Sequence, residues 1–182
     1  MHTRSDRPRI DGIKVSNELV AVKLQSTEEG INTESRLCGV LAKEKINMPF
    51  LSISRRGNSV SIICCVDKGE ERHAVEVLSP VFTRGGCSIK FIRSAGLISI
   101  FPHRSSFKIF IHALSVFVDS GIPVYGMSSS LSTLSFLTDF AAMERLIGLI
   151  TEQFILPPDH VPLRTEIKIK QIVISQAHAD QE

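Results

Sequence analysis

The sequence contains no tryptophan and a single tyrosine, Tyr125, among 182 residues. RNA-recognition modules stack bases on aromatic side chains of their central strands, and this chain offers no such platform. Its 21 basic and 19 acidic residues are mixed along the chain, so no basic stripe points to nucleic acid. We therefore expect no nucleic-acid partner.

The chain is also poor in metal-binding patterns. Its four cysteines form neither a Cys-x-x-Cys pair nor another metal-ligand spacing. Cys64 and Cys65 are adjacent in an apolar run, so we expect them on opposite faces of a strand as small, reduced, buried side chains. A copper chaperone needs two thiolates in its first loop, where this chain has none. We expect no metal and no cofactor.

Motifs of catalysis are absent as well. There is no Gly-x-Ser-x-Gly, His-Glu-x-x-His or Gly-rich phosphate loop, so we expect no catalytic residues and no enzyme activity. The most apolar stretch, 107–118, is short and contains Lys108 and His112, which predicts no membrane span. The N-terminus lacks the apolar core of a secretory signal, and we expect a cytoplasmic protein.

What the sequence does contain is one pattern used twice. An alternating apolar run leads to Asp67, which can cap a following amphipathic helix, and another leads to Asp139 in the same way. The first copy predicts strands over 19–24, 46–54, 59–66 and 88–92, with helices over 33–45 and after Asp67. The second predicts strands over 97–101, 122–127 and 131–138, a helix that ends at Gly121 and another from Asp139 to about residue 154. The alternating segment 166–174 predicts a last strand, which either completes the second copy or pairs back with the first.

The order β-α-β-β-α-β predicts an α+β fold of two tandem ferredoxin-like units, each an antiparallel sheet with helices on one face. We expect a flexible tail over residues 1–16, a first unit over 17–93, a second over 94–157, and a C-terminal strand and tail over 158–182. This topology serves RNA-binding modules, hydrolases and small-molecule sensors, so it does not identify a function.

Several segments resemble the tandem ACT domains that form the regulatory half of aspartokinases. The stretch 109–122 (IFIHALSVFVDSGI) is similar to that family's first helix with its closing Gly-Ile, and 134–139 (LSFLTD) is similar to its third strand entering an Asp-led helix. The resemblance covers residues 19–154. It implies a non-enzymatic regulatory protein that binds a small amino acid of the aspartate family, such as lysine or threonine, at an interface between ACT domains. It also implies a homodimer that docks on a biosynthetic enzyme.

The resemblance further implies where an effector would bind. In this family the effector lies between the first strand-to-helix loop of one domain and the second strand of a neighbour. The effector-binding candidates by position are Thr27, Glu28, Glu29, Gly30, Ile31 and Asn32 in the loop, with Asn47, Met48 and Pro49 on the strand side. The glutamates would bind the ammonium group, and Asn32 with the helix-start amides would bind the carboxylate.

The corresponding loop of the second unit departs from the family, because it lacks glycine and is basic. A second site there would take an anionic ligand, and its candidates are His103, Arg104, Ser105 and Ser106. The unit can equally be structural. The alternative to sensing is a ligand-free interaction module, which docks on a partner enzyme through its ACT-like sheets.

Overall fold

The computed structural model describes residues 7–27, 32–83, 86–158 and 162–165. This part of the chain is a mixed α/β fold with four α-helices and one sheet, antiparallel except where β1 meets β8. In chain order the elements are β1 (Gly12–Ser16), β2 (Leu19–Ser26), α1 (Thr33–Lys43), β3 (Phe50–Arg56), β4 (Ser59–Asp67), α2 (Glu71–Phe82), β5 (Cys87–Phe101), α3 (Phe107–Ser120), β6 (Val124–Ser129), β7 (Leu134–Asp139), α4 (Met143–Gln153) and β8 (Leu163–Thr165). Short 3-10 turns, Lys68–Glu70 and Phe140–Ala142, precede α2 and α4.

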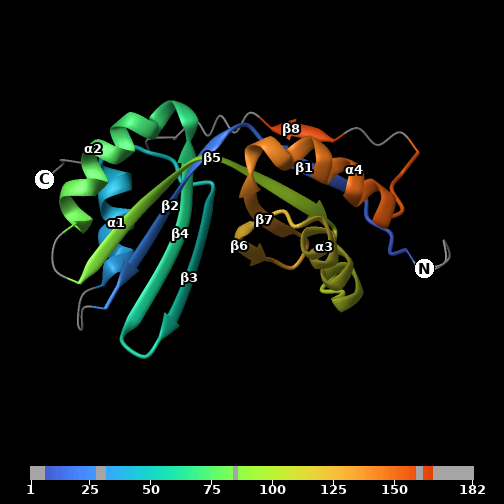
Figure 1. Cartoon of the computed structure of the whole chain (residues 1–182), viewed down its shortest axis with the longest axis horizontal. Helices are drawn as coiled ribbons and strands as arrows, with labels where there is room; N and C mark the ends of the chain where they lie inside the picture. The colour runs from blue at the N-terminus through green and yellow to red at the C-terminus, as the bar shows by residue number, and fades with distance from the viewer. Residues whose placement is uncertain (1–6, 28–31, 84–85, 159–161, 166–182) are drawn as a thin grey trace, which may run out of the picture.

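Strand β5 connects the two halves of the sheet. Its first part, 87–95, pairs with β2 in the order β3-β4-β2-β5, and we call these strands the first half. Its last part, 95–101, lies between β1 and β7, and with β6 these strands form the second half. Two separate strands were expected here, with a unit boundary between residues 93 and 94, but the chain stays extended because Ala95 pairs with both Leu19 and Asp139. Figure 1 shows β5 running from the side of α1 and α2 to the side of α3 and α4.

The N-terminal segment contributes to the core. Strand β1 pairs antiparallel with the end of β5, from Gly12 opposite Phe101 to Val15 opposite Ile98. The side chains of Ile10, Ile13 and Val15 are buried in the group that includes residues of α3 and α4. The prediction of a flexible tail over 1–16 is therefore wrong for residues 10–16, because these apolar side chains fill space under the helices. The segment 166–174, predicted as a last strand, lies outside the described residues.

Three groups of buried side chains hold the layers together. Phe82 belongs to the group between the first half and α1 and α2, and Phe136 to the group between the second half and α3 and α4. The third group lies on the strand faces turned away from the helices and includes Phe50, Ile63 and Leu137. As Figure 1 shows, the helix pairs lie at opposite ends of the molecule with the strands between them.

Gly126 of β6 marks how closely the two halves approach each other. A Cβ atom there would lie 2.9 Å from Cγ2 of Ile63 and 3.1 Å from Cε1 of Phe50. Both distances are too short for an ordinary carbon contact, so the approach requires a residue without a side chain.

The two helix starts led by Asp67 and Asp139 differ in detail. Oδ1 of Asp67 accepts a hydrogen bond from the amide of Gly69 at 2.8 Å, as a cap should. Asp139 makes no such bond and instead accepts one from the hydroxyl of Tyr125 on β6. The helix positions are confirmed, but the capping role expected of Asp139 is wrong. Gly121 ends α3 with a left-handed φ of 67°, as predicted.

The burial of β1 leads to a stability prediction. Ile13→Ala removes buried carbon atoms from a side chain that is 0% exposed, so we expect the free energy of unfolding to fall by about 2–5 kcal/mol. Urea unfolding followed by circular dichroism measures it. The matched control is Ile53→Ala on β3, where the residue is 43% exposed and the change should stay below about 1 kcal/mol. An Ile13 variant as stable as the parent would contradict a folded role for residues 10–16.

Candidate functional site

A hollow of about 320 Å³ lies where the loop 102–106, between β5 and α3, meets the turn between β6 and β7. Its walls combine hydroxyl groups with exposed and half-buried aromatic and aliphatic side chains. The lining residues are His103, Ser105, Ser106, Phe107, Phe110, Ser129, Ser130 and Leu131. An apolar hollow with a few convergent polar groups is the usual form of a small-molecule site.

His103 fixes the loop against the turn. It is 5% exposed, its Nε2 contacts the carbonyl oxygen of Ser130, and the hydroxyl of Ser129 lies 3.3 Å from the same nitrogen. Because a carbonyl oxygen can only accept, Nε2 must carry the hydrogen in this contact. The amide of His103 also donates to the carbonyl of Ser132 at 2.9 Å. His103 therefore shapes the wall of the hollow.

The start of α3 opens toward the hollow. Arg104 and Ser105 have φ values of 49° and 52°, in the left-handed region that non-glycine residues rarely adopt, and they turn the chain sharply into the helix. Ser106 caps α3 by accepting from the amide of Ile109 at 3.4 Å. The first amides of a helix carry partial positive charge, and no acidic side chain lines the hollow. The local field therefore favours an anionic group.

Three of the four residues predicted for a second site, His103, Ser105 and Ser106, line this hollow, whereas Arg104 does not. The sequence did not identify the opposite wall, formed by Ser129, Ser130 and Leu131. The sequence pattern predicts a turn at Ser129 and Ser130 and the start of a strand at Leu131, with no role in a site. The signal that could have found them is hairpin register: β7 antiparallel to β5 places the start of β7 beside the end of β5, and hence beside the loop that follows it.

The first candidate site is only partly described. Its residues 28–31, Glu28, Glu29, Gly30 and Ile31, lie outside the described residues. At its edges, the amide of Thr27 donates to the carbonyl of Gly86 at 3.1 Å, and Oδ1 of Asn32 accepts from the amide of Ser35 at 3.0 Å. The side-chain oxygen of Asn32 is thus already used to cap α1.

The strand-side candidates Asn47, Met48 and Pro49 lie before β3, at the opposite end of the sheet from Thr27. Ser26 pairs with Val60 and Phe50 pairs with Cys65, so the two places are separated by about 17 Å along β4 at roughly 3.3 Å per residue. Thr27, the described edge of the loop, and the strand side of this site therefore lie apart within one chain. The ACT resemblance implies a site shared with a neighbouring copy.

The thiols do not form a reactive or metal-binding centre. Burial raises the pKa of the Cys64 thiol to about 12, with a smaller contribution from Cys38, and burial also raises the pKa of Cys65. Cys64 and Cys65 lie in different apolar groups on opposite faces of β4, which confirms the prediction for this pair. Within residues 7–27, 32–83, 86–158 and 162–165, no three His, Cys, Asp or Glu side chains gather as a metal site. No helix of this part of the chain is long and apolar enough to cross a bilayer.

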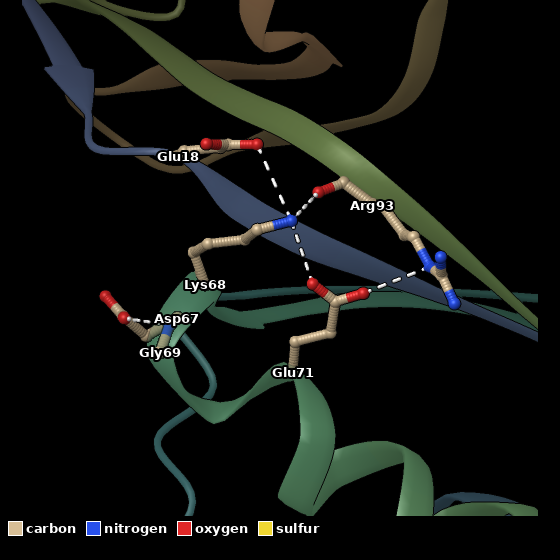
Figure 2. A network of polar contacts seen from close by, with 6 residues as sticks. All are labelled: Glu18, Asp67, Lys68, Gly69, Glu71 and Arg93. Carbon is tan, nitrogen blue, oxygen red and sulfur yellow. Dashed lines mark hydrogen bonds and ion pairs between the residues drawn. The ribbon is translucent and has the colours of Figure 1, made fainter.

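A network of charges at the start of α2 connects this helix with β5 and with Glu18, the residue before β2. Figure 2 shows Nζ of Lys68 directed at the carbonyl oxygen of Arg93 (2.8 Å), at Glu71 (2.8 Å) and at Glu18 (3.7 Å). Nε of Arg93 lies 3.1 Å from the other oxygen of Glu71. The hydrogen bond between Lys68 and Glu71 raises the pKa of Lys68 and lowers the pKa of Glu71. Each charge has an opposite partner, so the network is a clamp between elements rather than a ligand site.

Comparison with known proteins identifies the fold. The sequence matches no protein-family model, and no curated protein matches it. Solved structures do match. The regulatory subunit of aspartate kinase from Thermus flavus superposes with a TM-score of 0.72 at 14% identity, over 81% of this chain and 99% of that one.

Two longer proteins contain the same fold. Aspartate kinase from Synechocystis matches with a TM-score of 0.69 at 19% identity, over 82% of this chain and 28% of that one. E. coli aspartokinase III, in complex with lysine and aspartate, matches with a TM-score of 0.58 at 15% identity, over 84% of this chain and 35% of that one. The fold of the chain is therefore that of aspartate kinase regulatory domains, and the resemblance noted in the sequence is confirmed at the level of fold.

The buried thiols lead to a labelling prediction. Cys38 and Cys87 are partly exposed and should react with iodoacetamide in the folded protein, whereas Cys64 and Cys65 should react only after unfolding. The thiols of Cys64 and Cys65 are buried and protonated, and only the thiolate is a good nucleophile. Mass spectrometry before and after denaturation distinguishes the four sites. Rapid modification of Cys64 in the folded state would contradict this arrangement.

The Lys68 network leads to a pH prediction. Because the pKa of Glu71 is lowered on folding, its contribution to stability is present above its ordinary pKa and is lost as pH falls through the lowered value. We expect Glu71→Gln to be less stable than the parent at about pH 7 and the difference to shrink at about pH 3 and in high salt.

The control for this change is Glu76→Gln, which breaks only the exposed pair with Arg72 at 2.8 Å on the surface of α2. Urea unfolding at both pH values measures both variants, and Glu76→Gln should have the smaller effect. An equal loss from the two substitutions would show that the network is no stronger than an ordinary surface pair.

Proposed function

We propose that this protein is a non-enzymatic regulatory protein that binds a small amino acid, in the manner of an aspartate kinase regulatory subunit. The observation that carries the proposal is the likeness to a separate regulatory subunit over 99% of that subunit's length. The amino acids of first choice are lysine and threonine, members of the aspartate family. Lysine is named in the matching complex of E. coli aspartokinase III.

The proposal interprets the chain as two ACT-like units that share β5. The first, over residues 17–93, has the order β2-α1-β3-β4-α2-β5 with strands arranged β3-β4-β2-β5. The second, over 94–157, uses the last part of β5, then α3, β6, β7 and α4. Strand β1 would serve as its fourth strand, because it pairs with β5 on the side away from β7. This interpretation moves residues 10–16 from a tail into the second unit.

The hollow beside α3 is the proposed effector site. The effector's carboxylate would lie at the first amides of α3 near Ser106, where the helix dipole favours negative charge. Its side chain would lie against Phe107 and Leu131, which are 77% and 88% exposed. A site that combines Thr27–Asn32 of one copy with Asn47, Met48 and Pro49 of another remains part of the proposal, and it requires a homodimer.

Regulation would follow from differential binding. An effector in the hollow touches both the loop 102–106 and the turn 129–131, so it would favour the arrangement in which they are held together. The coupling to a partner enzyme equals the difference in effector affinity between the two arrangements of the complex. An effector with equal affinity for both would not regulate.

A ligand-free docking module is the second candidate, and a specific feature of α3 favours it. Phe107, Ile111 and Val118 are 77%, 56% and 72% exposed and recur at helical spacing. Apolar side chains gathered on an exposed helix face are typical of a protein interface. In this alternative the hollow is empty in the working protein, and the helix docks on a biosynthetic enzyme.

A thermal-shift screen against the proteinogenic amino acids and the intermediates of the aspartate pathway tests the proposal. Binding to the folded state raises the melting temperature by mass action. The free energy of unfolding increases by about 2.7 kcal/mol when the ligand concentration is a hundred times Kd. We expect a rise with one or a few amino acids. No rise with any compound, from a protein shown to be folded, would favour the docking module.

Two substitutions to glutamate test whether the hollow is the effector site. Leu131→Glu places a negative charge at the hollow and should weaken carboxylate binding by about tenfold or more. Val118→Glu places the same charge on the far part of α3, outside the hollow, and should leave the ligand affinity unchanged. An unchanged response in Leu131→Glu, lost instead in Asn47→Ala, would move the effector to the first unit.

A further inference from the structure

We propose that a separate cleft, on the face of the second half turned away from its helices, binds a small organic carboxylate through Lys14 and the hydroxyl pair of Ser99 and Ser135. The cleft has a volume of about 240 Å³. Thr133 and Phe101 also line it, and Pro49 closes it from the segment before β3. It therefore lies between the two halves of the sheet.

A polar row crosses the middle of this face. Lys14 of β1 pairs with Ser99 of β5, Ser99 with Ser135 of β7, and Ser135 with Ser128 of β6. Residues directly opposite one another on neighbouring strands share a face of the sheet. The neighbouring row, Ile13, Ile100 and Leu134, faces the helices and is fully buried. Four aligned polar residues thus form one row on the face turned away from the helices.

The serine pair has a hydrogen to donate. The two Oγ atoms are 2.7 Å apart, and the residues are only 7% and 9% exposed. One hydroxyl hydrogen is used within the pair, which leaves the other for an acceptor atom placed in the cleft.

Lys14 determines the charge of the ligand. It is the only charged side chain among the lining residues, and no carboxylate lines the cleft. Within the described parts of the chain Lys14 has no ion pair, in contrast to Lys68, which has two. A cation that converges with hydroxyl donors favours an anion, and a carboxylate matches this combination of charge and hydrogen-bond donors.

The walls and the volume limit the size of the ligand. The ring of Phe101 lies against Gly12, where an added Cβ would be 2.6 Å from Cζ, so the ring forms a fixed apolar wall. Pro49 adds a second apolar contact from the other half. The volume corresponds to about eight water molecules at roughly 30 Å³ each, below the usual range of drug-sized sites. This suits a carboxylate with a short apolar chain.

This cleft is independent of the hollow beside α3. The hollow lies on the helix side at the end of β5, and the cleft lies on the opposite face of the same strand. The residues that line the two sites do not overlap. Substitutions can therefore test one site without altering the other.

Isothermal titration calorimetry of the full chain with butyrate, succinate and inorganic phosphate tests the proposal. We expect saturable binding of at least one carboxylate, stronger than that of phosphate. Lys14→Met keeps the apolar stem, removes the charge and should weaken binding about tenfold or more, and Lys14→Arg should retain it. Ser135→Ala removes one hydroxyl and should weaken binding by a smaller factor.

The matched controls are Lys23→Met, an exposed lysine on β2 of the first half, and Val118→Glu, an exposed position of α3 that lines neither site. Both should bind the carboxylate as the parent does. Circular dichroism verifies that each variant is folded. If Lys14→Met does not fold, Ser135→Ala tests the cleft. The proposal is overturned if no carboxylate binds saturably, or if phosphate binds more tightly than the carboxylates. It is also overturned if the folded Lys14→Met and Ser135→Ala variants bind the carboxylate with the same affinity as the parent.

Discussion

The rest of the structure depends on the backbone pairing of β5 with strands of both halves of the sheet. At its middle Ala95 is paired on one side with Leu19 and on the other with Asp139, so the strand belongs to both halves of the sheet at once. The Lys68 network reinforces this point, because it ends on the carbonyl of Arg93. The hollow follows the end of β5 and the cleft lies on its face, so one strand positions both candidate sites.

Much of the fold could be predicted from the sequence, because the helices and hairpins have strong periodicity. The predicted helix ending at Gly121 and the hairpins around 57 and 130 have their expected places. Two features could not be predicted. Residues 93–96 (RSAG) are polar or small and are typical of a linker, yet β5 continues through them and Ala95 pairs on both sides. Strand β1 contributes few apolar residues and follows a basic segment, so only its tertiary partner, the edge of β5, reveals it.

Only one wall of the hollow beside α3 could be predicted from the sequence. Residues 103–106 stand out because a basic loop precedes an apolar helix, and that is a local pattern. Ser129 and Leu131 meet this loop through the register of the sheet, which a sequence does not display. For the same reason His103 gave no sign of burial, since its partner is a carbonyl group in a turn far along the chain. Lys14 lies within residues 1–16, which the sequence predicts to be a flexible tail, so nothing marks it as part of a site.

The position of β1 has a consequence for how the chain folds. Residue 12 pairs with residue 101, so the whole first half is inserted between two neighbouring strands of the second. Pairing of such distant residues raises contact order, which slows folding. During synthesis the first half can fold once residues 87–95 of β5 have emerged, whereas β1 must wait for the end of that strand. Because β1 also pairs in parallel with β8, two segments far apart in the sequence lie side by side at this edge of the sheet.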